Sequence, residues 1–149
     1  MEHGFFHPDT GYWQTTGYPA EKYRKAYPEG YVEIPVKPAQ YHEWTGSEWI
    51  EVLPPEFDPL THKIEKITER DGDTFTYRYD VLELPLETAE KNMRAKRNGL
   101  LAQSDWVVPF YLEKGQPVPQ EWQDYRQALR DIPQQEGFPY AVIWPTKPE

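Results

Sequence analysis

The most regular alternation of apolar and polar positions lies in the second part of the segment from Lys63 to Leu84. There, apolar residues take every second position and polar residues lie between them. The apolar members are Phe75, Tyr77, Tyr79 and Val81. A period of two is typical of a β-strand with one buried face. Because Asp71-Gly72 is a preferred pair for a type I′ turn, we predict a hairpin with a two-residue loop, in which Glu65 lies opposite Arg78.

An earlier pair of aromatic segments predicts a second hairpin. Residues 41–44 and 49–52 are rich in aromatic and branched side chains, and the four residues between them include Gly46. This register places Trp44 opposite Trp49. The two indoles either pack in the core or form a platform on which a ligand stacks.

Residues 31–36 predict a further strand, since aromatic and β-branched residues dominate them. Pro35 cannot donate a backbone hydrogen bond, so we expect this strand at the edge of its sheet. An edge strand can accept a strand from a partner.

Helical signals begin at Pro85, which suits the first position of a helix. Acidic residues come early and basic residues late in residues 85–104, as the helix dipole favours. The apolar stripe is weak in the middle, and Gly99 lowers the helix propensity. We therefore expect a partly exposed helix over residues 85–104, anchored by its C-terminal end.

A second helix, predicted over residues 119–132, has a stronger pattern. Its apolar residues recur at the spacing of one helix face and should point inward. They are Trp122, Tyr125 and Leu129. Pro133 ends this helix. After it, residues 138–145 form a short apolar segment bounded by prolines, which we expect to lie as an extended strap across the core.

These elements predict an α+β fold: antiparallel β-hairpins over residues 31–84, two α-helices, and the C-terminal strap. The chain changes character near Pro54-Pro55. We therefore expect a β-type region rich in proline and aromatic residues over 1–59, and a domain with a hairpin and two helices over 60–149. A length of 149 residues suits one domain with a small appendage.

Composition and charge narrow the classes of partner. Aromatic residues make up 15% of the chain, so ring area must supply much of the burial. The net charge of -9 disfavours nucleic acid, because attraction to phosphate dominates that affinity. The absence of cysteine excludes disulfides and thiolate metal sites. No apolar run is long enough for a membrane span, and the first residues lack the pattern of a signal peptide, so we expect a soluble protein that stays where it is made.

Catalytic and metal-binding motifs are weak. His3 and His7 have the spacing of a helical metal pair, but Gly4 and Pro8 oppose a helix there. Asp9-Thr10-Gly11 spells the triplet of aspartic proteases, but that chemistry needs two copies on buried apolar turns. Here the triplet occurs once, between Pro8 and Tyr12-Trp13, so we interpret it as a turn. Phosphate-binding loops and nucleophile elbows are absent. We predict a protein that is not an enzyme, with no catalytic residues, no metal and no cofactor.

Three consecutive motifs in the last third of the chain carry a resemblance to a known family. They are RNGLLAQSDW at 97–106, WQDYRQALRDIP at 122–133 and GFPYAVIWP at 137–145. Together these motifs resemble the tail assembly chaperone and tail-fibre assembly proteins of tailed bacteriophages, over residues 90–148. Residues 107–112 depart from that pattern because they are more apolar, and they form either additional core or a contact with a specific partner.

The resemblance implies a small, non-catalytic chaperone that binds a phage tail-fibre or other tail protein during virion morphogenesis in the host cytoplasm. Two alternatives remain open. One is a structural subunit of the tail or tail fibre that is retained in the virion. The other is a glycan-binding module that stacks sugars on exposed rings. The candidate stacking residues are Trp13, Trp44 and Trp49.

Candidate partner-binding residues follow from the helical pattern and from the residue types enriched in interface hot spots. They are Trp106, Tyr125, Arg126, Arg130 and Trp144. We expect the aromatic members to form one cluster with Trp122 and the two arginine heads to reach outward along their apolar stems. Asp105, just past the first helix, should pair with one of the two arginines.

Overall fold

The computed structural model describes all 149 residues and has the α+β composition that the sequence predicts. The chain divides into two compact units. Unit 1 consists of Met1–Pro55 and Lys66–Asp80, and unit 2 consists of Glu56–Glu65 and Val81–Glu149. The chain therefore leaves unit 1, returns to it and leaves it again. The separation into regions 1–59 and 60–149 stays a prediction.

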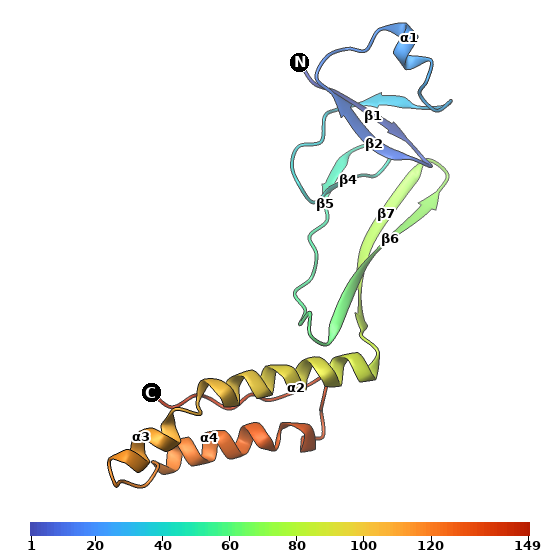
Figure 1. Cartoon of the computed structure of the whole chain (residues 1–149). Coiled ribbons are helices and arrows are strands. Elements are labelled where there is room, and N and C mark those ends of the chain that lie inside the picture. The colour runs from blue at the N-terminus through green and yellow to red at the C-terminus, as the bar shows by residue number, and fades with distance from the viewer. The chain divides into compact units, whose positions relative to one another are not determined.

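Unit 1 contains a three-stranded antiparallel sheet in the order β2-β1-β3 (Figure 1). Its strands are β1 (His3–His7), β2 (Gly11–Thr15) and β3 (Val32–Ile34), and the short helix α1 (Glu21–Arg24) lies between β2 and β3 in the sequence. Asp9 and Thr10 lie in the turn between β1 and β2, as predicted. The edge position of β3 is also confirmed, and Pro35 follows its last residue.

Aromatic residues cover both faces of this sheet. Adjacent residues of a strand point to opposite faces. Phe5 of β1 stacks on Trp13 of β2 at a centroid distance of 5.7 Å, whereas Phe6 packs edge-to-face on Phe75 at 5.2 Å and pairs across the strands with Tyr12. Because neither face of β1 is polar, the segment lacks the alternation of a half-buried strand, and the sequence pattern predicted neither β1 nor β2.

The predicted hairpin around Gly46 is confirmed as β4 (His42–Trp44) and β5 (Trp49–Glu51). Trp44 lies opposite Trp49, with ring centroids 5.5 Å apart. The indole Nε1 of Trp49 donates to the carbonyl of Pro35 at 2.8 Å. The core of unit 1 consists of Phe6, Ile34, Trp44 and Phe75.

The long hairpin consists of β6 (His62–Asp71) and β7 (Thr74–Glu83). Its loop is Gly72-Asp73, one residue later than predicted, and it is not type I′, because Gly72 has a positive φ (62°) and Asp73 does not. The expected pairing of Glu65 with Arg78 is therefore wrong. Arg78 Nη1 binds Glu69 Oε1 at 2.6 Å instead.

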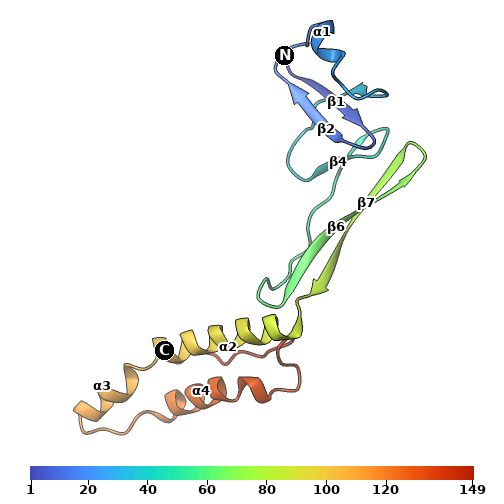
Figure 2. The ribbon, with the colours of Figure 1, turned by 45° about the vertical axis from the view of Figure 1, so that its right-hand side comes forward.

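Unit 2 is helical apart from the base of that hairpin. Its helices are α2 (Leu86–Gln103), α3 (Val107–Glu113), α4 (Gln120–Arg130) and the single-turn 3₁₀ helix η1 (Ile132–Gln134). The two predicted helices are confirmed as α2 and α4, while α3 is an additional helix. Both views show α2 and α4 running side by side (Figures 1 and 2).

The apolar contacts of α2 extend from Ala89 near its start to Leu101 near its C-terminal end, so the expected anchoring of that end is confirmed. Ala89 and Met93 are buried, Leu100 and Leu101 pack against the core of unit 2, and Leu86 is exposed. In α4 the predicted face is confirmed. Its buried members are Trp122, Tyr125 and Leu129.

The C-terminal segment folds back along α2 as the predicted strap (Figure 2). Cations of α2 lie over its rings: Arg94 over Phe138, and Lys96 Nζ over Trp144 at 4.3 Å. Tyr140 donates its hydroxyl to the carbonyl of Leu84 at 2.6 Å. The strap is thus held by ring contacts and by a hydrogen bond to the chain just before α2.

Candidate partner-binding surface

The short helix α3 starts where α2 ends. The buried Ser104 caps the end of α2, because its Oγ donates to the carbonyl of Leu101 at 3.0 Å, and its own carbonyl accepts from the N–H of Val107. Pro109 lies in the first turn of α3, where backbone N–H groups have no partner within the helix. The proline therefore costs α3 no hydrogen bond.

One side of α3 belongs to the core of unit 2. Val107 is fully buried against Trp122, Tyr125 and Leu129 of α4, and Tyr111 packs against the same cluster. Val107 and Tyr111 are four residues apart and so lie on the same face of the helix. Their packing therefore fixes the orientation of α3 about its own axis.

The rest of α3 exposes large apolar side chains. Leu112 is 75% exposed, Trp106 50%, Val108 44% and Phe110 41%. We call these four residues the α3 surface. Surface helices normally turn a polar face to water, and α3 has only Glu113 for that purpose. Trp106 and Phe110 lie on one flank of the helix and Val108 and Leu112 on the other, since residues four apart share a face. Large exposed apolar side chains gathered on one short helix are typical of a site that binds another protein.

Ring contacts hold the aromatic members of the α3 surface in place. The indole of Trp106 lies edge-to-face on Phe110 at 5.6 Å and on the buried Trp122 at 5.7 Å. Lys114 Nζ lies 4.1 Å from the centre of the Phe110 ring. Since these rings contact the core or one another, a partner would meet a surface whose side chains are already ordered.

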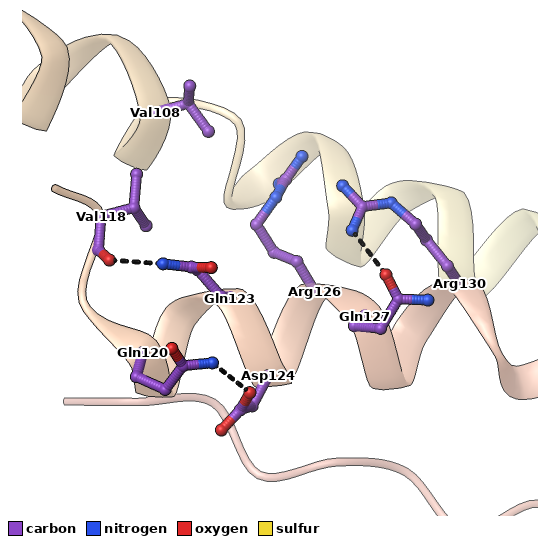
Figure 3. A pocket seen from close by; sticks show the side chains of 8 residues that line it. All are labelled: Val108, Val118, Gln120, Gln123, Asp124, Arg126, Gln127 and Arg130. Carbon is purple, nitrogen blue, oxygen red and sulfur yellow. Dashed lines mark hydrogen bonds between the residues drawn. The ribbon is translucent and has the colours of Figure 1, made fainter.

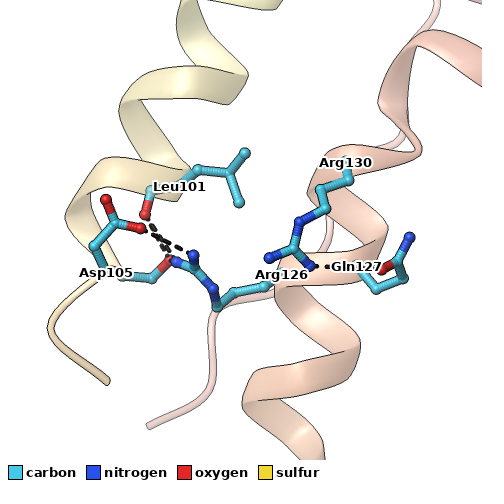
Figure 4. Close-up of polar contacts among 6 residues, drawn as sticks. Leu101, Asp105, Arg126, Gln127 and Arg130 are labelled. Carbon is cyan, nitrogen blue, oxygen red and sulfur yellow. Dashed lines mark hydrogen bonds and ion pairs between the residues drawn. The ribbon is translucent and has the colours of Figure 1, made fainter. Parts of the chain in front are cut away.

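A guanidinium group joins α4 to the end of α2 beside the α3 surface (Figure 4). Arg126 donates to the carbonyl of Leu101 at 2.9 Å, to Ser104 Oγ at 2.6 Å and to Asp105 Oδ1 at 2.9 Å. The Arg126 side chain is only 13% exposed. These three hydrogen bonds all lie within the fold, so Arg126 stabilises the packing of the two helices.

A groove of about 470 Å³ runs along α4, and side chains of α4 and Val108 of α3 line it (Figure 3). Val108 and Val118 line one end of the groove, and three glutamines, two arginines and Asp124 line the rest. Gln123 donates to the carbonyl of Val118 at 2.8 Å, and Gln120 to Asp124 Oδ1 at 2.8 Å. The groove therefore offers a polar margin to the apolar α3 surface.

The residues predicted for partner binding do not share one surface. Trp106 is half-exposed, Arg130 is exposed, Trp144 is partly buried under Lys96, and Tyr125 is buried. The predicted aromatic cluster forms, and Asp105 pairs with Arg126 as expected. The expectation that both arginine heads reach outward is wrong for Arg126, because the end of α2 supplies acceptors for its guanidinium. Sequence reasoning did not select Val108, Phe110 and Leu112 individually, although their apolar segment was noted.

The three tryptophans considered for glycan stacking lie in different environments. Trp44 is buried, and Trp49 packs edge-to-face on Tyr12 at 5.0 Å. Trp13 is the neighbour of Tyr12 in β2 and so faces the opposite side of the sheet, against Phe5. Trp13 therefore does not share a stacking platform with the other two indoles.

The structure contains no cluster of three or more His, Asp or Glu side chains that could hold a metal ion. It also contains no helix long and apolar enough to cross a membrane.

Comparison with known proteins finds one family whose model matches the helical part of unit 2. Residues 90–149 match the family described as phage tail assembly chaperone protein, which confirms the resemblance seen in the sequence motifs. The matched segment contains nearly all of α2 and the whole of α3, α4 and the strap. No curated protein and no solved structure matches the chain.

Proposed function

We propose that this protein is a non-enzymatic phage tail assembly chaperone, and that it binds a tail or tail-fibre protein through the α3 surface. The observation that carries the proposal is a helix with an almost wholly apolar exterior inside the segment that matches the tail assembly chaperone family. A chaperone of this kind covers apolar surface of an unassembled partner, so it must itself present ordered apolar side chains.

The α3 surface suits temporary binding. It is small, its margin is polar along the groove beside α4, and it is exposed in the free chain. Interfaces below the standard size are typical of weak, transient complexes. Such a surface can hold a subunit before assembly and release it when the subunit meets its final neighbours.

Co-expression tests this proposal. The chain is produced together with a phage tail-fibre protein as the candidate partner, and soluble, assembled fibre is measured by size-exclusion chromatography with light scattering. We expect the wild-type chain to raise the yield of soluble fibre oligomer. An unchanged yield and oligomeric state would contradict the proposal.

A pair of matched double variants assigns the effect to α3. Phe110→Ser with Leu112→Ser removes two exposed members of the α3 surface and should abolish the gain in soluble fibre. Leu86→Ser with Ile143→Ser removes two exposed aliphatic residues of unit 2 outside α3 and should leave it intact. If both pairs behave alike, the α3 surface is not the binding site.

Mass spectrometry of purified particles distinguishes a chaperone from a retained subunit. A chaperone that works in the host cytoplasm should be absent from the virion. A stoichiometric amount in the particle would favour the alternative of a structural tail subunit.

A further inference from the structure

The open edge of β3 in unit 1 adjoins a cavity. β1 pairs on one side with β2 and on the other with β3, whereas β3 pairs with β1 alone. The outward backbone groups of Val32–Ile34 thus have no strand partner. Unpaired N–H and C=O groups along a strand edge are complementary to another extended chain.

The cavity has a volume of about 260 Å³. Phe6, Trp44 and Phe75 line it and are all buried, and Val32 is 50% exposed at its margin. Val32 pairs with Phe6 across the strands, so both side chains point to the same face of the sheet. The cavity therefore lies on the face to which Val32 points.

We propose that β3 is a second docking site, which binds an extended segment of a partner protein by strand addition. In an added strand, the residue opposite Val32 points to the same face as Val32. An apolar side chain at that position would enter the cavity beside Val32. Backbone hydrogen bonds would supply affinity and the cavity would supply specificity, which is the division found in strand-addition complexes.

The charge on the other face of β3 indicates what the partner carries. Glu33 points away from the cavity, and its carboxylate is 46% exposed and lies 2.9 Å from His3 Nδ1. A basic residue opposite Glu33 would be favoured, because opposite charges across a strand pair attract. The occupant is therefore a segment in which apolar and basic residues alternate.

The same carboxylate disfavours a second copy of this chain as the occupant. An antiparallel pair of β3 edges centred on Glu33 would place two glutamates directly opposite each other. Pro35 also ends the strand after Ile34, so the edge takes only a short segment.

This site is independent of the proposed function. β3 lies in unit 1 and outside the segment that matches the chaperone family, whereas the α3 surface lies in unit 2. The α3 surface offers apolar side chains alone, while β3 offers a backbone edge with one apolar cavity. The two sites thus require partner segments of different chemistry.

Peptide titration of the full chain tests the inference. The probe is a capped heptapeptide of alternating Lys and Val, and its controls are the Glu-Val peptide and a Lys-Val peptide with N-methylated valines. We expect the Lys-Val peptide to shift the backbone amide resonances of residues 30–34 and the indole resonance of Trp44. N-methylation should abolish these shifts, because it removes backbone donors.

A charge reversal supplies the decisive variant. Glu33→Lys should weaken binding of the Lys-Val peptide by about threefold to fivefold and favour the Glu-Val peptide instead, as expected for one cross-strand charge pair. Val32→Thr keeps the branched side chain and should bind the Lys-Val peptide with little change. The Phe110→Ser, Leu112→Ser chain should also bind it normally.

Three results would overturn the inference. The first is the absence of shifts in residues 30–34 at millimolar peptide, and the second is an unchanged peptide preference in Glu33→Lys. The third is a set of shifts that depends on protein concentration without peptide, which would identify a second copy as the occupant.

Discussion

At the scale of single residues, Arg126 shows how a local pattern and a tertiary contact differ. The prediction that Asp105 pairs with either Arg126 or Arg130 is confirmed, and the partner is Arg126. The direction of the Arg126 guanidinium group was not predicted, because its acceptors, the carbonyl of Leu101 and the hydroxyl of Ser104, lie more than twenty residues earlier in the chain. No periodicity within α4 reveals those acceptors.

Removing the Arg126 guanidinium should destabilise unit 2. Arg126→Met keeps an apolar stem but leaves buried Ser104 without one partner, so we expect a loss of about 1–3 kcal/mol in the free energy of unfolding. Urea unfolding followed by tryptophan fluorescence measures it. Arg130→Met is the control, and its exposed side chain should change stability by less than ~0.5 kcal/mol. Equal losses in the two variants would contradict this role.

Tyr77 makes unit 1 sensitive to alkaline pH. Burial and the nearby Glu43 carboxylate raise the pKa of Tyr77 to about 12, and its neutral hydroxyl donates to the carbonyl of Trp44 at 2.7 Å. In an unfolded chain a tyrosine titrates near pH 10. The raised pKa therefore contributes stability that is fully present below pH 10 and is lost as the pH rises through about 12.

Urea unfolding between pH 9 and 12 should separate this contribution from other groups that titrate there. The Tyr77→Phe variant has no hydroxyl at this position that could ionise, so it should lose less stability across this pH window than the wild-type chain does. Parallel curves for the two proteins would show that Tyr77 does not supply the alkaline sensitivity.

At the scale of elements, the sequence patterns predicted the strands and helices that have one apolar and one polar face. They missed elements that are apolar on both faces or on their exposed side. β7 and α4 each have a single apolar face, and both were predicted. β1 and β2 were missed because Phe5 and Phe6 are buried on opposite faces. α3 was missed because its exterior is apolar and contains Pro109, so neither an amphipathic pattern nor the residue preferences indicated a helix.

Gly99 is the weak point of α2 and can be improved. It lies exposed in the helix, its φ is not positive, and a β-carbon there would meet no other atom within 4 Å. Gly99→Ala should therefore stabilise the chain by about 0.5–1 kcal/mol, because alanine loses less backbone entropy in a helix. Thermal and urea unfolding measure the gain.

Gly137→Ala is the contrasting variant. A β-carbon at Gly137 would overlap the carbonyl oxygen of Ala141, in a tight turn where the Ala141 N–H donates to the Gly137 carbonyl at 2.7 Å. We expect destabilisation at this position. If both substitutions changed the free energy of unfolding in the same direction, the backbone environments assigned to the two glycines would be wrong.

At the scale of the whole molecule, the sequence predicted the class of fold but not the division of the chain into two units. The sequence predicted the α+β fold and the match of residues 90–149 to the tail assembly chaperone family, because periodicity and motifs can be recognised without coordinates. It did not reveal that residues 66–80 belong with the N-terminal unit, since this depends on contacts such as the Phe75 N–H with the Thr45 carbonyl.

The net charge of -9 predicts no affinity for nucleic acid. Fluorescence anisotropy of a labelled DNA duplex should stay constant during titration with the chain at 50 mM salt, where a basic binding site would act most strongly. A saturable rise that falls with added salt would reveal a local basic site that the overall charge conceals.

The return of the chain to unit 1 affects where genetic recombination can exchange parts of this protein. A single genetic crossover near codon 56 would split unit 1, because residues 66–80 would then come from the other parent. A crossover near codon 85 would leave unit 1 intact and transplant the helices and the strap together. The incoming helices would need to match the retained residues of unit 2 through contacts such as Asn92 with the carbonyl of Leu60 and Tyr140 with that of Leu84. The segment that carries the family motifs is therefore one that recombination can exchange as a cassette.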